Sequence, residues 1–106
     1  MKLENIIPKF KEEGYVNAGQ AVLNNEEINE LSTLCNEIYS KLLVDYENGV
    51  KNKDFLYNTK GTCGFSRVPE HHHKLAELLN KVISDQNIKK ILEGVLGKNY
   101  KIWQIV

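Results

Sequence analysis

Residues 24–49 read NNEEINELSTLCNEIYSKLLVDYENG, and this stretch decides the fold. Its apolar residues recur at steps of three and four, which places them on one side of an α-helix. They are Ile28, Leu31, Leu34, Cys35, Ile38, Tyr39, Leu42 and Tyr46. Asn24 or Asn25 can cap the start; Asn24 with Glu27 has the spacing of a capping box, and Gly49 can end the helix in the left-handed conformation. A one-sided helix of about six turns needs the rest of the chain to cover its apolar stripe.

A short helix and a short strand are expected before this long helix. Pro8 suits the first turn of a helix, where its missing N–H costs nothing, and Gly14 can close that helix. Tyr15–Ala18 then has the composition of a short strand.

Two more helices are expected after it. Pro69 opens the third, whose apolar residues share one face: Leu75, Leu78, Leu79, Val82 and Ile83. Ser84 or Asp85 ends this helix and caps a fourth, which stops before Gly97. Gly94 weakens the fourth helix and marks a close approach of another part of the chain.

The last residues have strand composition. Tyr100–Val106 is mainly apolar on both faces, which is typical of a strand buried on two sides. We expect Tyr15–Ala18 and Tyr100–Ile105 to be neighbours in one sheet, and residues 1–106 to be a single partial domain that stops within that sheet. Residues 50–68 lose all periodicity and read as a long loop, either a surface excursion or a functional segment.

Composition narrows the classes of partner. Lys and Arg together number 14, as do Asp and Glu, so nothing electrostatic points to nucleic acid or to an anionic membrane. No apolar run approaches the ~18 residues of a membrane span, and the first residues lack a signal-peptide core. Cys35 and Cys63 do not form a short-spaced pair, which favours reduced thiols and a cytoplasmic location.

The candidate chemistry is sparse. His71, His72 and His73 are consecutive, and consecutive helical residues point about 100° apart, so we interpret them as a solvated first turn and not as metal ligands. Cys63 lacks a base or a redox motif beside it, which favours a structural thiol. Lys60-Gly61-Thr62 lacks the glycine pattern of a phosphate loop. Gln104 stands on an otherwise apolar face, where its amide needs a hydrogen-bond partner.

Three blocks carry a family resemblance: FKEEGYV at 10–16, LNNEEINEL at 23–31, and ILEGVLGKNYKIW at 91–103. Their content and spacing resemble the N-terminal region of the phytanoyl-CoA dioxygenase family. This resemblance implies an enzyme that uses non-haem Fe(II) and 2-oxoglutarate to oxidise a small organic substrate, built on a double-stranded β-helix of the jelly-roll or cupin type. It also implies that Gln104 faces the co-substrate pocket and that the loop 50–68 lies near the pocket mouth.

The metal site of that family has no counterpart in this sequence. The family supplies iron ligands as His-x-Asp and a distal His, and a late Arg binds 2-oxoglutarate. This sequence has no His-x-Asp and no histidine after His73, and its single arginine, Arg67, lies in another region. We therefore expect neither Fe(II) nor 2-oxoglutarate to bind to these 106 residues alone.

Three functional hypotheses stay open at this point. The chain is the N-terminal region of such an oxygenase, a free-standing helical interaction module that recruits a partner by strand addition, or a degenerate remnant without activity. The substrate class is open among acyl thioesters, amino-acid derivatives and natural-product scaffolds. In every case we expect the isolated chain to self-associate through its last strand.

Overall fold

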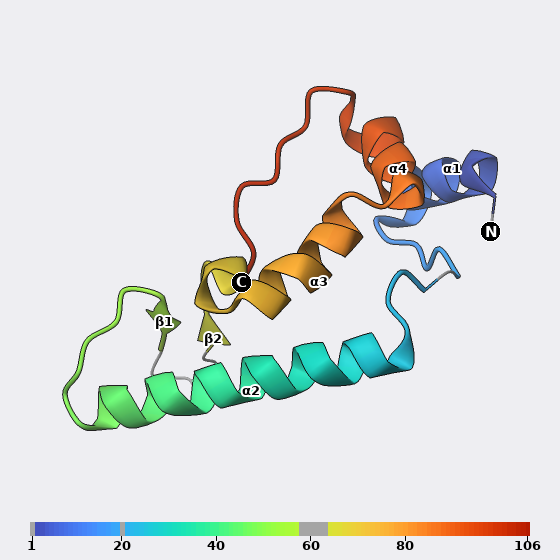
Figure 1. Cartoon of the computed structure of the whole chain (residues 1–106). Coiled ribbons are helices and arrows are strands. Elements are labelled where there is room, and N and C mark those ends of the chain that lie inside the picture. Colours follow the sequence, from blue (N-terminus) through green and yellow to red (C-terminus); the bar gives the residue numbers. More distant parts are fainter. Residues whose placement is uncertain (1, 20, 58–63) are drawn as a thin grey trace.

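The computed structural model describes residues 2–19, 21–57 and 64–106. Within these ranges the chain forms four α-helices, two short strands and one 3-10 turn (Figure 1). In chain order they are α1 (Leu3–Glu13), α2 (Asn25–Glu47), β1 (Phe55–Leu56), β2 (Gly64–Phe65), η1 (Val68–His71), α3 (His73–Ile83) and α4 (Gln86–Leu96). The protein is therefore helix-rich α+β, and the expected four helices and two short strands are confirmed.

The start of α2 has the predicted capping box. The Asn24 side chain accepts the Glu27 backbone N–H at 2.8 Å, and the Glu27 carboxylate accepts the Asn24 N–H at 3.0 Å. Lys81 on α3 donates to the same carboxylate, with its Nζ 2.8 Å from Oε2. Gly49, with φ of 82°, follows the other end of the helix as predicted. The capping residues thus set both ends of the longest helix.

Helix α1 is longer than predicted. It begins at Leu3 with Pro8 in its interior, so the prediction that Pro8 opens the helix is wrong. Pro8 has no N–H to donate to the preceding turn, and the helix continues without that bond. Gly14 ends α1 as predicted, with φ of 81° and its N–H bonded to the Phe10 carbonyl at 2.7 Å.

Helix α3 buries its predicted face at Leu75 and Leu78. Pro69 lies in η1, and α3 begins after it at His73, so the third helix starts later than predicted. Of the two candidate caps of α4, Asp85 serves: its carboxylate accepts the Ile88 N–H at 3.0 Å. Gly94 is the expected close approach, because a Cβ there would run into the Ile7 side chain of α1.

The predicted strands are in the wrong places. Tyr15–Ala18 and Tyr100–Ile105 have no regular secondary structure, and they do not pair with each other. In Figure 1 the chain after α4 crosses back to end beside α3, whereas the chain after α1 passes α4 and runs to the start of α2. Both segments lack a neighbouring strand in the described residues, and strand composition alone does not form a sheet.

The two strands instead lie in the segment predicted to be an unstructured loop. β1 and β2 pair antiparallel, with Phe55 opposite Phe65 and Leu56 opposite Gly64. This two-stranded sheet packs on α2. The described residues contain this one two-stranded sheet. The double-stranded β-helix, which needs many more strands, therefore stays a prediction.

The main core lies between α2, β2, η1 and α3. Leu42, Phe65, Val68 and Leu75 form one buried cluster, and Leu75 is fully buried. Partly buried residues from the apolar stripe of α2 surround them: Leu31, Leu34, Cys35, Ile38 and Tyr39. The predicted covering of the α2 stripe is thus confirmed for its middle turns, while Ile28 and Tyr46 at its ends stay exposed.

The chain is more open than a compact domain. Its radius of gyration is 16.7 Å, against about 13 Å for a compact domain of about 100 residues, and its extents are 51 × 30 × 23 Å. Helix α2 runs along one side with α3 above it, and α1 and α4 lie together at one end (Figure 1). None of the described helices combines the length and hydropathy that a membrane span requires.

Candidate functional site

Gln104 lines a pocket of about 400 Å³ between η1 and the last residues of the chain. The other lining residues are Arg67, Pro69, Glu70, Ile83, Ile102, Trp103 and Ile105. Gln104 itself is exposed, so water can reach its amide, and the expectation of an amide on a buried face is wrong. Val68 N–H donates to the Ile105 carbonyl at 3.2 Å and holds the last residues against η1.

A buried carboxylate anchors the wall of this pocket. Asp54 is only 6% exposed. Arg67 Nε lies 2.8 Å from Asp54 Oδ1, and Arg67 Nη2 lies 3.1 Å from Oδ2. His71 Nε2 lies 3.1 Å from the same Oδ2. We call Asp54, Arg67 and His71 the Asp54 cluster. Arg67 and His71 contact the Asp54 carboxylate, whose negative charge would be costly to bury without partners.

The backbone around the cluster is also fixed. The Asn52 side chain accepts the Asp54 N–H at 2.8 Å, and the Asp54 carbonyl accepts the Ser66 N–H at 2.7 Å. Arg67 has φ of 53° and ψ of 44°, a left-handed conformation that is uncommon for a residue with a side chain. This conformation starts η1 directly beside the Asp54 carboxylate, and the surrounding hydrogen bonds hold it there.

The charges in the cluster are tightly paired. The Arg67 side chain, mainly through its hydrogen bonds, holds the pKa of the Asp54 carboxyl below its usual value, although burial opposes this shift. The same hydrogen bonds raise the pKa of Arg67. Arg67 Nη1 also lies 3.0 Å from Glu70 Oε2. All three guanidinium nitrogens therefore already face a carboxylate.

This pairing bears on the implied co-substrate. A 2-oxoglutarate carboxylate at Arg67 would share the guanidinium with Asp54 and Glu70, which already contact all three of its nitrogens. In residues 2–19, 21–57 and 64–106, no group of three or more His, Cys, Asp and Glu side chains is placed to hold a metal ion. The role of Gln104 in binding a co-substrate stays a prediction.

The three histidines have separate roles. His71 belongs to the Asp54 cluster and packs edge-on against Phe65 at 5.1 Å between ring centroids. His72 caps α3, with its Nδ1 accepting the Lys74 N–H at 3.0 Å. His73 stacks on His72. The interpretation as a solvated first turn is wrong for His71 and for His72, which are both partly buried. The sequence alone does not show that Asp54 reaches His71.

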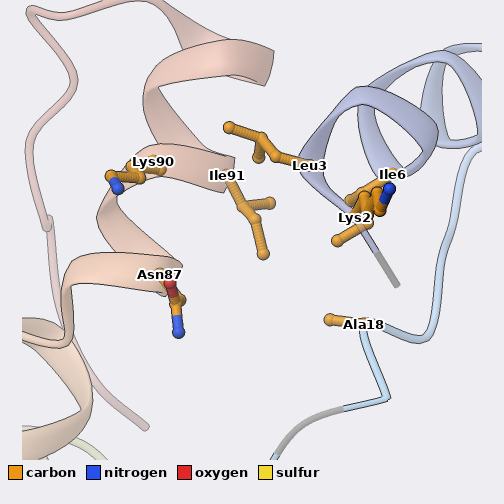
Figure 2. A pocket seen from close by; sticks show the side chains of 7 residues that line it. All are labelled: Lys2, Leu3, Ile6, Ala18, Asn87, Lys90 and Ile91. Carbon is orange, nitrogen blue, oxygen red and sulfur yellow. The ribbon is translucent and has the colours of Figure 1, made fainter.

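A second hollow of about 480 Å³ lies between α1 and α4 (Figure 2). Leu3 and Ile91 extend into it from the two helices, and Ala18 borders it. The ammonium groups of Lys2 and Lys90 lie on opposite sides of the hollow in Figure 2. They do not converge on one point, so this hollow lacks the paired cations that would bind a single anionic group.

The described cysteine is a packing residue. Cys35 lies on α2 beside the core, and burial raises the pKa of its thiol. A raised pKa leaves less of the reactive thiolate, which favours a packing role for Cys35. Cys63 and the Lys60-Gly61-Thr62 segment lie outside the described residues.

Comparison with known proteins leaves the family open. No family model, no curated protein and no solved structure matches the chain.

Proposed function

We propose that this chain is the N-terminal helical region of a non-haem Fe(II)/2-oxoglutarate-dependent oxygenase, and that it packs against the main sheet of a double-stranded β-helix. The observation that carries the proposal is that the last residues of the chain expose apolar side chains and pair with neither of the described strands. Residues 100–106 have no regular secondary structure and pair with neither of the described strands; the Ile105 carbonyl accepts the Val68 N–H, and Trp103, Ile102 and Val106 are exposed. Such a segment is suited to join a sheet supplied by further residues of the enzyme.

The energetics favour such a covering layer. Each large apolar side chain contributes roughly 1.5–3 kcal/mol when it is fully buried, and a domain is stable by only about 5–15 kcal/mol. Leaving several of them in water therefore removes a large share of the attainable stability. The open shape of the chain, with a radius of gyration of 16.7 Å, agrees with a missing layer.

The family resemblance supports the same proposal. The block at 10–16 spans the end of α1 at Gly14, the block at 23–31 spans the capping box of α2, and the block at 91–103 spans the end of α4. Each block thus falls on a helix end of the structure, where sequence determines the direction of the chain.

Within this proposal the chain has a supporting role. Bound iron supplies the oxygen chemistry, and its ligands come from residues other than those described. Gln104 is placed at a pocket wall, where its amide can donate to or accept from a bound small molecule. A cytoplasmic location belongs to the same proposal, because the free thiol of Cys35 persists in a reducing compartment.

A second candidate is a free-standing interaction module that recruits a partner by strand addition. Residues 100–106 favour it, because they pair with neither of the described strands and their backbone can add to a partner's strand. The two candidates differ in the size of the natural protein. The oxygenase requires a longer polypeptide, whereas the module has the 12.2 kDa mass of these residues.

The first test is the natural length of the protein, from the coding sequence after codon 106 and the mass of the protein in its source cells. A continuing frame with His-x-Asp, a distal His and a late Arg supports the oxygenase, and a stop codon directly after Val106 contradicts it. If the frame continues, the whole protein should bind 2-oxoglutarate with Fe(II) and convert it to succinate. In the whole protein, Gln104→Leu should raise the KM for 2-oxoglutarate, and the exposed Lys101→Leu should leave it unchanged.

A further inference from the structure

The pocket beside Arg67 has a ligand preference that can be inferred from its charges and its walls. Its volume, about 400 Å³, is within the range of small-molecule sites. It is bordered by η1, by Ile83 at the end of α3, and by the last residues of the chain. These elements bring a carboxylate, an indole and aliphatic side chains to one place.

Negative charge prevails at this wall. The positive charge of Arg67 is balanced by the buried Asp54 carboxylate, which accepts two hydrogen bonds from the guanidinium. Glu70 then remains as a second carboxylate on the same guanidinium, and its side chain is 62% exposed. By their formal charges, Asp54, Arg67 and Glu70 together carry one net negative charge.

The pocket lining also includes an aromatic side chain. Trp103 lines the pocket and is 92% exposed, so its indole face is open to a ligand. An indole is the most favourable of the aromatic side chains for binding a cation over its face. Pro69, Ile83 and Ile102 add aliphatic surface that suits methyl groups on a nitrogen.

We propose that this pocket binds a small organic cation of the quaternary or alkylated ammonium class, and that Trp103 and Glu70 of its lining recognise the positive charge. An anion is disfavoured, because the one guanidinium in the pocket already faces two carboxylates. This inference depends only on the described residues and does not require the proposed oxygenase activity.

Trp103 is the single tryptophan of the chain, so its fluorescence reports on the pocket directly. The test is a titration with choline at about pH 8, where the carboxyl group of Glu70 is ionised. The controls are 3,3-dimethylbutan-1-ol, the uncharged analogue of the same shape, and sodium chloride at equal ionic strength. We expect choline to bind with a Kd on the order of millimolar. The Kd of the alcohol should be about twofold to fivefold higher, which is the effect of an exposed cation–π contact.

Two variants of matched exposure test the role of the carboxylate. Glu70→Gln should weaken choline binding by about threefold, the scale of an exposed ion pair, and should leave binding of the alcohol unchanged. Glu77→Gln is the control: Glu77 is 64% exposed, pairs with Lys74 three residues earlier as Glu70 pairs with Arg67, and does not line the pocket. It should leave choline binding unchanged.

Trp103→Ala removes the fluorescent reporter, so its binding is measured from the choline methyl signals by saturation-transfer NMR. We expect the signal to fall strongly, with an unchanged circular dichroism spectrum because Trp103 is exposed. Equal binding of choline and its uncharged analogue would overturn the inference. So would unchanged choline binding by Glu70→Gln, or tighter binding of 2-oxoglutarate than of choline by these residues.

Discussion

Replacing Leu75 by alanine tests whether the small cluster around it holds the fold together. Leu75 is fully buried and lies in the cluster with Leu42, Phe65 and Val68. The change removes the equivalent of three methylene groups, worth about 2.4 kcal/mol by transfer from water, and the cavity that remains adds to this loss. A hollow of about 450 Å³ lies beside the cluster and is lined by Leu31, Phe65 and Val68 among others. Because this space lets neighbouring side chains shift, we expect a total loss of about 2.5–4 kcal/mol, below the largest losses known for such changes.

Urea unfolding followed by circular dichroism measures this loss, with the slope of the transition compared between the two proteins. The control is Leu96→Ala on α4, the same substitution at a leucine that is 63% exposed, which should cost less than about 0.5 kcal/mol. A loss below about 1 kcal/mol for Leu75→Ala, with an unchanged slope, would show that the cluster is not the main source of stability.

Three other expectations follow from the structure. The pKa of Asp54 is lower in the folded protein, so its carboxylate stabilises the fold fully above the unfolded pKa near 3.8 and loses this effect as the pH falls through the folded pKa. Urea unfolding at several pH values should therefore show a weaker acid dependence of stability for Asp54→Asn than for the unchanged protein, and identical dependence would contradict the ion pair. Gly94→Ala should destabilise the protein despite the ~1 kcal/mol better helix propensity of alanine, because the added methyl group meets the Ile7 side chain. In a double-mutant cycle, Ile7→Ala should remove most of this loss of stability, and additive effects of the two substitutions would refute the contact. Ile102→Ser with Val106→Ser should reduce self-association in light scattering without loss of helix signal, and unchanged association would exclude the last residues as its cause.

The helices could be predicted because their signals are local. The capping box of Asn24, the cap at Asp85 and the glycine after α1 each depend on residues within one or two turns. Pro8 misled the prediction of where α1 starts, because the packing of α1 on α4 outweighs one lost backbone hydrogen bond.

The strands and the Asp54 cluster could not be predicted for the opposite reason. A strand needs a partner, and the sequence of Tyr15–Ala18 does not say whether one is near. Asp54 and Arg67 are 13 residues apart, and neither position has a periodic pattern around it. One signal was available: a single arginine, in a segment that also holds an aspartate, is a reasonable candidate for a buried ion pair.

The elongated shape has a consequence for how the protein opens. Helices α1 and α4 pack on each other at one end, while the Leu75 cluster lies between α2, η1 and α3. Few side chains connect these two regions, so the α1–α4 pair can separate while the cluster stays intact. Amide hydrogen exchange should therefore be two-tiered: the amides of α1 exchange through a sub-global opening, and those in the middle of α2 exchange only when the whole chain unfolds.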